Sequence, residues 1–315
     1  MPEGPSLVIL REQAAAFTGR TIEQVEGNTS IDKSRLVGQR IVALRTWGKH
    51  FLIEMPEFSL RVHFLLFGSY RINERKDGPP RLSLRFTGGD ELNFYTCSVK
   101  YIEDPLDDVY DWHADVMSAA WKPALALQRL RAAPEALACD ALLDQDIFAG
   151  VGNIIKNEVL YRIRVHPLST IGGLPPAKLR ALVSEARQYS FDFLEWKKAF
   201  VLKQHWLAHR KSHCLRCDLQ LTKATLGKTQ RKSYFCSNCQ ALYGPASEMQ
   251  TVAAKRAAGT AKRAAISDGS AASRPSRASK AALETPEAPL ASITTKTKRA
   301  AKASPTARRV AAGSS

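Results

Sequence analysis

The segment LLDQDIFAGVGNIIKNEVLYRIRVHP, from Leu142 to Pro167, decides how the chain is organised. Two stretches with apolar residues at helical spacing flank the turn from Gly150 to Asn153, so the segment predicts a pair of helices. Glycines allow a close approach of the backbone to a ligand, and Asn153 is a residue type that caps helices. Unpaired N–H groups at the start of the second helix would suit a phosphate. A plain helical-hairpin turn is the alternative, and the pattern alone leaves it open.

The regions on either side of this segment differ in their residue pattern. Residues 121–210 are rich in Ala, Leu, Gln and Arg at helical spacing, which predicts a helical domain. Residues 20–105 alternate polar and apolar side chains, as in IVALRTWGKHFLIEM (Ile41 to Met55), and this predicts an antiparallel β-sandwich or barrel. A helix from Ser6 to Thr18 precedes it, which gives an N-terminal domain of residues 1–120. The expected fold class is therefore multidomain α+β.

Two CxxC pairs lie in residues 211–246, with 18 residues between the inner cysteines. Four thiolates at this spacing suit a tetrahedral zinc ion, and four protein ligands leave no position for an activated water. We therefore expect one structural Zn²⁺ in a zinc ribbon. Its ligands are Cys214, Cys217, Cys236 and Cys239. The other two cysteines, Cys97 and Cys139, are interpreted as buried structural thiols.

The hairpin between the CxxC pairs is basic near its tip. The charged residues there are Lys223, Lys228, Arg231 and Lys232. Their charge suits contact with the phosphates of a nucleic acid backbone. A solvated basic hairpin would have the same sequence, so the alternative stays open for Arg231 taken alone.

The charge of the chain favours a polyanionic partner. The formal net charge is +16, and residues 250–315 contain 13 Lys and Arg against 3 Asp and Glu. Because Lys and Arg neutralise phosphates and release counterions, nucleic acid is the first candidate and an anionic membrane the second. The sequence has neither a long apolar run nor a secretory signal, which predicts a cytoplasmic, nucleoid-associated protein without a membrane partner. Residues 247–315 are expected to form a disordered basic tail.

Five motifs occur in an informative order. The first is MPEGP, in which removal of Met1 would leave Pro2 as a free secondary amine beside the carboxylate of Glu3. The others are WGK at Trp47 to Lys49, HFLLFG at His63 to Gly68, DQDIFAGVGN at Asp144 to Asn153, and QRKSYFCSNCQ at Gln230 to Gln240. Through these motifs, residues 1 to about 245 resemble the formamidopyrimidine-DNA glycosylase and endonuclease VIII family.

The resemblance implies a fold and an activity. The fold is an N-terminal helix on a β-sandwich, a helix-two-turn-helix domain and a zinc ribbon, with damaged double-stranded DNA bound between the two halves. The activity is that of a base excision repair DNA glycosylase, acting as a monomer, that removes oxidised bases. The enzyme is also expected to be an AP lyase, which cleaves the strand by β,δ-elimination. Gly4 favours the endonuclease VIII branch, and the loop that contacts the damaged base is expected within residues 168–210.

The resemblance also implies roles for individual residues. Pro2 is the nucleophile, Glu3 transfers a proton, and Lys49 holds a phosphate near the lesion. Asn153 and Arg231 bind the flanking phosphates. The residues that fill the gap left by the everted nucleotide are Leu65, Leu66 and Phe67. Alternating residues of a strand are usually buried in a core, so a core position is the alternative for these three.

The chemistry agrees with these residue types. A secondary amine that attacks the anomeric carbon of the sugar gives an iminium ion with no N–H proton to lose, and this ion remains an electron sink. An α-amino pKa of about 7.7 to 8.0 leaves a neutral, nucleophilic fraction near pH 7. Ser6 departs from the family pattern, because many members have a glutamate there.

Two other functional classes stay open. The first is a non-catalytic DNA-binding or architectural protein that keeps the fold, although such a protein has no need of Pro2 beside Glu3. The second is a ribosome- or RNA-associated zinc-ribbon protein. The predicted order of β domain, helical turn and ribbon argues against it.

Overall fold

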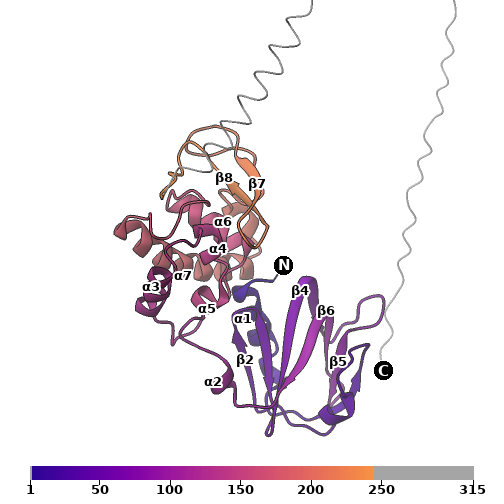
Figure 1. The fold of residues 1–315 in the computed structure, drawn as a ribbon. Coiled ribbons are helices and arrows are strands. Elements are labelled where there is room, and N and C mark those ends of the chain that lie inside the picture. Colours follow the sequence, from indigo (N-terminus) through magenta and orange to yellow (C-terminus); the bar gives the residue numbers. More distant parts are fainter. Residues whose placement is uncertain (1, 245–315) are drawn as a thin grey trace, which may run out of the picture. The chain divides into compact units, whose positions relative to one another are not determined.

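A computed structural model describes residues 2–244 of the chain (Figure 1). The predicted disordered tail, residues 247–315, lies outside the described residues. Along the sequence, a β-sheet is followed by helices and then by a two-stranded hairpin, which is the predicted order. The described residues belong to one compact unit. The domain boundaries expected after residues 120, 210 and 246 therefore stay predictions.

Six antiparallel strands form one sheet in the order β1-β5-β6-β4-β3-β2. The bounds are β1 Ile22–Glu26, β2 Ala43–Trp47, β3 His50–Glu54, β4 Ser59–Ile72, β5 Leu82–Phe86 and β6 Glu91–Ile102. The long strands β4 and β6 pair with each other, and β3 and β5 pair with their outer edges at opposite ends. Apolar side chains from all four strands meet in one core cluster, which confirms the predicted N-terminal β architecture.

Helix α1, Gly4–Gln13, begins earlier than predicted and is followed by a separate 3₁₀ turn at Ala15–Phe17. Pro5 explains the early start, because proline has a fixed φ that suits the first helical turn and lacks only an N–H that would be unpaired there. Leu7 and Leu10 of α1 are buried in the core of the sheet. The helix thus carries the N-terminal residues to the edge of that core.

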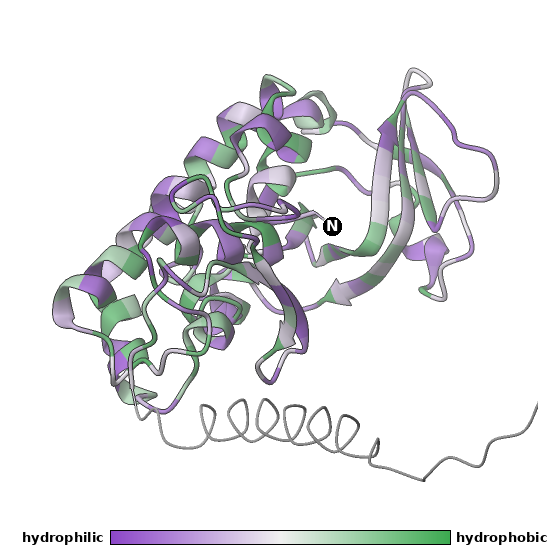
Figure 2. Ribbon diagram, turned by 90° about the horizontal axis from the view of Figure 1, so that it is seen from above, coloured by the Kyte–Doolittle hydropathy of each residue, from purple (hydrophilic) through white to green (hydrophobic). Residues whose placement is uncertain are grey.

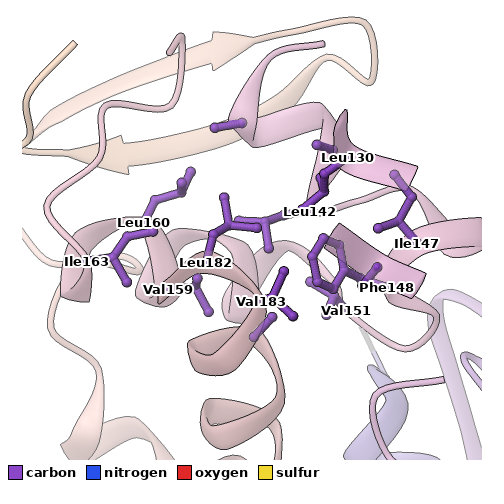
Figure 3. Packing of buried hydrophobic residues seen from close by; sticks show 14 of the residues in the cluster. Leu130, Leu142, Ile147, Phe148, Val151, Val159, Leu160, Ile163, Leu182 and Val183 are labelled. Atoms are coloured by element: carbon purple, nitrogen blue, oxygen red, sulfur yellow. The ribbon is translucent and has the colours of Figure 1, made fainter. Parts of the chain in front are cut away.

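Among the described residues, five helices lie in the predicted helical region, residues 121–210, and one short helix precedes it. The short helix is α2 Leu106–Val109, and the five are α3 Pro123–Ala132, α4 Ala138–Ala141, α5 Gln145–Phe148, α6 Asn153–Arg162 and α7 Pro176–Lys198. Two further 3₁₀ turns lie at Lys33–Leu36, in the sheet domain, and at Leu202–His205, after α7. Figure 3 shows Val159 and Leu160 of α6 near Leu182 and Val183 of α7, in a second core distinct from that of the sheet.

The range in which a base-contacting loop was expected, residues 168–210, is mostly helix α7. Leu179, Leu182, Val183 and Ala186 are buried in the second core, and their spacing is that of one helical face. The irregular part of the range is thus confined to the segments on either side of this helix.

The hairpin that follows comprises β7, Thr222–Leu226, and β8, Arg231–Phe235. Its turn lies against the helical region, because the carboxylate of Asp140 accepts hydrogen bonds from the backbone N–H groups of Lys228 (2.9 Å) and Thr229 (3.2 Å). A Cβ at Gly227 would lie 2.4 Å from the same carboxylate. The basic tip, whose charge suits contact with phosphates, is thus held on α4 through Asp140.

Hydrophilic and hydrophobic residues alternate along the helices (Figure 2). Within residues 2–244, no helix combines the length and the apolar character needed to cross a membrane.

Three consecutive polar residues of α6 are buried and connect this helix to the last part of the chain. Lys156 donates a hydrogen bond to Ser233 Oγ at 2.9 Å. Asn157 lies 3.1 Å from a ring nitrogen of His209. Glu158, fully buried, accepts from the backbone N–H groups of residues 207, 208 and 209 at 2.9, 2.9 and 2.7 Å. A buried carboxylate is tolerated when its oxygens are satisfied in this way.

Replacing Glu158 by Ala is expected to lower the free energy of unfolding by about 3 kcal/mol, because buried N–H groups lose their acceptor. Glu158→Gln should lose less, since one amide oxygen can still accept. Urea denaturation followed by circular dichroism measures both. Glu135→Ala, at an exposed position, is the matched control and should change stability little. A Glu158→Ala variant as stable as this control would contradict the anchoring role.

Candidate active site

Three glycines from distant parts of the sequence meet beside the N-terminus. The N–H of Gly4 donates to the carbonyl of Gly150 at 2.9 Å. A Cβ at Gly4 would lie 2.9 Å from the Cα of Gly150, and a Cβ at Gly48 would lie 3.1 Å from the nitrogen of Gly150. We call this contact of Gly4, Gly48 and Gly150 the glycine junction. It brings α1, the β2–β3 turn and the turn before α6 together without side chains between them.

The side chain of Glu3 is buried at the start of α6. Its two oxygens accept from the backbone N–H groups of Ile154 (2.8 Å) and Ile155 (3.2 Å). Gly152 makes room for it, because a Cβ there would lie 2.4 Å from Glu3 Cδ. Asn153 was expected to cap this helix, but the cap residue is Gly152 and the anion at the helix start is Glu3. The positive end of a helix dipole favours such a carboxylate.

Burial changes the proton affinities of two neighbouring charged groups. Desolvation raises the pKa of Glu3 above its usual range, although the α6 N–H groups and the ammonium of Lys49 counteract part of the effect. Desolvation likewise lowers the pKa of Lys49, against the attraction of Glu3. Burial thus shifts both pKa values toward the neutral forms, and for Glu3 this is the direction expected of a residue that exchanges protons near neutral pH.

Lys49 is held in a two-residue turn between β2 and β3, whose flanking residues Trp47 and His50 are paired. Gly48 has a φ of +54°, which glycine adopts at little cost. The sequence thus forms a tight hairpin that presents Lys49 at its tip.

Two pockets lie next to these residues. The proline pocket, of about 680 Å³, is lined by Pro2, Ser6, Tyr70, Arg71 and Lys197 among others. The lysine pocket, of about 700 Å³, is lined by Lys49, Leu65, Leu66, Phe67, Gln145 and Arg231 among others. Phe64 lines both pockets. Side chains from the sheet, from α5 and from β8 therefore converge on one region.

The three apolar residues expected to fill a gap in DNA are not in the core. The exposed fractions are 46% for Leu65, 49% for Leu66 and 83% for Phe67. The register explains this: Phe64 pairs with Cys97 and Ser69 with Tyr95, so residues 65–68 bulge out of β4. The core alternative from the alternating pattern is therefore wrong for these residues.

Asn153 and Arg231 lie where the helical region meets the hairpin. The amide nitrogen of Asn153 donates to the carbonyl of Lys232 at 3.0 Å, and Arg231, at the start of β8, lines the lysine pocket. The N–H groups of Ile154 and Ile155 are occupied by Glu3. They are thus not the phosphate site that the glycine-containing turn suggested.

Sequence analysis missed Asp115, which is 2% exposed and accepts a hydrogen bond from the N–H of Gly48 at 3.1 Å. It also missed the buried side chains of residues 156–158. The available signal was the triplet Lys-Asn-Glu between the apolar pairs at 154–155 and 159–160. A polar triplet in an otherwise apolar helix requires buried partners.

The four predicted zinc ligands come together. The sulfur atoms of Cys214, Cys217, Cys236 and Cys239 all lie within 4.8 Å of one another. Four thiolates at such separations fit a tetrahedral Zn²⁺ with no open position, as in a structural site. Tyr161 of α6 lies 3.2 Å from Cys214 Sγ, which places the cluster against the helical region.

We expect the purified protein to contain about one zinc ion per chain, bound by these thiolates. Cys217→Ser should lose the metal and lower the thermal midpoint, because zinc binding stabilises a small ribbon that has few apolar side chains. Elemental analysis and thermal denaturation measure the two effects. Cys97→Ser, at a buried cysteine outside the cluster, is the control and should keep its zinc. Metal-free protein with four intact thiols would argue against the site.

Comparison with known families agrees with this arrangement. The formamidopyrimidine-DNA glycosylase N-terminal domain matches residues 1–97, and the formamidopyrimidine-DNA glycosylase H2TH domain matches residues 114–195. Endonuclease 8-like 2 of Homo sapiens is 30% identical over 258 residues, which cover 76% of this chain and 75% of the relative.

Other relatives are matched over a smaller share of their length. Endonuclease 8-like 2 of Mus musculus is 36% identical over 58% of this chain and 57% of the relative. Endonuclease 8-like 3 of Xenopus laevis is 30% identical over 73% of this chain and 39% of the relative. The chain thus spans about half the length of several of the curated relatives that it matches.

Solved structures share the fold. A viral DNA glycosylase superposes with a TM-score of 0.67 at 18% identity, covering 76% of this chain and 100% of that one. The Lactococcus lactis formamidopyrimidine DNA glycosylase, bound to DNA with an AP site, gives a TM-score of 0.67 at 20% identity, covering 76% and 99%. From the two domain models and the relatives, the chain belongs to the formamidopyrimidine-DNA glycosylase and endonuclease VIII family, with its similarity leaning to the endonuclease 8-like proteins.

Proposed function

We propose that this protein is a bifunctional DNA glycosylase and AP lyase that removes oxidised bases from double-stranded DNA. The observation that carries the proposal is the placement of Pro2. It lines an open pocket of about 680 Å³ and directly precedes a buried acid, Glu3. Lys49 interacts electrostatically with that acid. The glycine junction thus gathers the residues that we propose as nucleophile, proton donor and phosphate-binding cation.

The proposed reaction begins after Met1 has been removed. The nitrogen of Pro2 forms a bond to the anomeric carbon of the sugar, and the bond from that carbon to the base breaks. The base leaves with the bonding electrons and takes up a proton. Opening of the sugar ring then gives an iminium ion on the Pro2 nitrogen. Loss of a proton from the adjacent carbon expels the 3′ phosphate, and a second elimination expels the 5′ phosphate.

Glu3 is the proposed source of the proton that the base or the ring oxygen takes up. Its pKa is raised by burial, so the protonated form is more available near neutral pH than for an exposed glutamate. The N–H groups of Ile154 and Ile155 stabilise the carboxylate that remains after transfer. The start of α1 favours the neutral form of the Pro2 amine, because its positive end disfavours an ammonium.

The lysine pocket and its surroundings are the proposed place of the DNA contacts. Lys49 and Arg231 line it and supply positive charge for phosphates beside the lesion. The amide of Asn153 uses one N–H for Lys232, and its second N–H is proposed to reach a flanking phosphate. The exposed bulge at residues 65–67 provides apolar side chains to fill the space left by an everted nucleotide.

The names of similar proteins support the substrate class. The Lactococcus lactis glycosylase is bound to AP-site DNA in one solved structure and to DNA with an oxidised pyrimidine in another. The resemblance of Gly4 to the endonuclease VIII branch implies a preference for oxidised pyrimidines, and the endonuclease 8-like relatives support that branch. Action as a monomer and a nucleoid location stay predictions.

Borohydride trapping tests the proposed mechanism. Protein without Met1 should form a covalent adduct with duplexes carrying thymine glycol, 8-oxoguanine or an abasic site, because borohydride reduces the iminium to a stable amine. Pro2→Gly should weaken the adduct strongly. Glu3→Gln should slow trapping on base-bearing duplexes more than on the abasic one, since no base leaves an abasic site.

Glu12→Gln, an exposed glutamate on the same helix, is the control and should trap as the wild type does. If zinc-bound protein confirmed to lack Met1 formed no adduct on any duplex, the proposal would fail. A non-catalytic DNA-binding protein would then be the better description.

Salt dependence tests the phosphate contacts. Arg231→Ala should lower the slope of log K against log salt by about 0.9, the value for one lost phosphate contact on B-DNA. Asn153→Ala should weaken binding with little change in slope, because the amide is neutral. Fluorescence anisotropy with an uncleavable abasic analogue measures both. Lys100→Ala, at an exposed position on β6, is the control. If Arg231→Ala gave the same slope of log K against log salt as this control, the phosphate contact would be refuted.

A further inference from the structure

Asp115 lies in the segment that joins the sheet to the helical region. The backbone N–H of Val116 donates to the carbonyl of Ala149 (3.1 Å), and the N–H of Ala149 donates to the carbonyl of Ala114 (2.9 Å). Asp115 is therefore fixed beside Gly150 and the glycine junction. Its side chain is 2% exposed.

Both oxygens of this carboxylate accept backbone hydrogen bonds. Oδ1 accepts from Met117 at 2.8 Å, within its own segment. Oδ2 accepts from Gly48 at 3.1 Å, in the turn that presents Lys49. Only the bond from Gly48 connects Asp115 to another segment, and Gly48 is the residue directly before Lys49.

The position is costly for an ionised group. Burial raises the pKa of Asp115 to about 6, and Arg187 and Arg11 offset only part of that effect. The carboxylate is still the main form at neutral pH, and only this form offers acceptor lone pairs on both oxygens without a proton. The two backbone hydrogen bonds from Met117 and Gly48 offset part of the desolvation penalty.

Sterics and this hydrogen bond constrain the turn in different ways. Contact of Gly48 with Gly150 and the side chain of Ala149 sets how closely the turn approaches the helical region. A close contact between backbones does not set the rotation of the turn. The bond from Gly48 to Asp115 adds a directional constraint on the turn that carries Lys49.

We propose that Asp115 is a positioning residue that holds Lys49 toward the bound DNA phosphate through the N–H of Gly48. The inference rests on the proposed function, because it takes Lys49 to be a phosphate contact. Asp115 lines neither the proline pocket nor the lysine pocket, yet it is given a defined effect on DNA binding.

A double-mutant cycle tests the proposal. Asp115→Asn keeps the shape, but only one of its two side-chain atoms can accept, so one of the backbone bonds is lost. Binding is measured across a salt series on a duplex with an uncleavable abasic analogue. Lys49→Ala should lower the salt slope by about 0.9. Asp115→Asn should lower it in the same direction, and the double variant should match Lys49→Ala, because both changes remove the same contact.

Two further measurements make the outcomes unambiguous. The thermal midpoint of Asp115→Asn should stay within about 4 °C of the wild type, as expected for a change of roughly 1 kcal/mol or less. Asp115→Ser is measured as well, because an Asn side chain could keep the Gly48 bond and lose only the Met117 bond, whereas the shorter Ser side chain loses the reach to Gly48; the same lower slope is expected. Asp108→Asn, at an exposed position on α2, is the control.

An unchanged slope in the Asp115 variants, or effects that add fully to that of Lys49→Ala, would overturn the proposal. A wild-type protein that binds the duplex but gives no borohydride adduct would instead refute the proposed chemistry, and the binding cycle would still report on Asp115.

Discussion

The close backbone contact of Gly4 with Gly150 is the constraint on which the rest of the site depends. No side chain fits between them, since a Cβ at Gly4 would lie 2.9 Å from the Cα of Gly150. That contact lets Glu3 reach the start of α6, where its carboxylate takes the place of an external anion. A single short segment thus supplies the proposed nucleophile and the proposed acid, which is also the anion at the start of α6.

Burial then sets the chemistry of the groups so placed. A carboxylate and an ammonium removed from water are both pushed toward their neutral forms, while their mutual attraction opposes the change. The pKa values of Glu3 and Lys49 are therefore set by the balance of burial and mutual attraction. Asp115 is subject to the same penalty, with a pKa near 6. Burying such charged groups lowers the free energy of unfolding, and hydrogen bonds from backbone N–H groups offset part of this loss.

The zinc ribbon is integrated with the site by polar contacts that start on α6. Lys156 and Glu158 bind segments close to the cysteines, and Asp140 holds the turn of the hairpin. Few apolar side chains are available there, so buried hydrogen bonds replace a larger core, and a metal bound by the four cysteines would add to them. The position of Arg231 in the lysine pocket is a consequence of this docking.

The sequence by itself determined the order of sheet, helices and ribbon and the zinc ligands, because residue periodicity and cysteine spacing are local signals. Family motifs led to Pro2 and Glu3, whose roles stay proposals. Tertiary structure alone decided that the carboxylate of Glu3, and not a phosphate, occupies the N–H groups of α6, and that Gly152 is there to admit it. It also showed that residues 65–67 leave the strand alternation and that Asp115 reaches Gly48. These features depend on contacts between residues far apart in sequence, which no local pattern records.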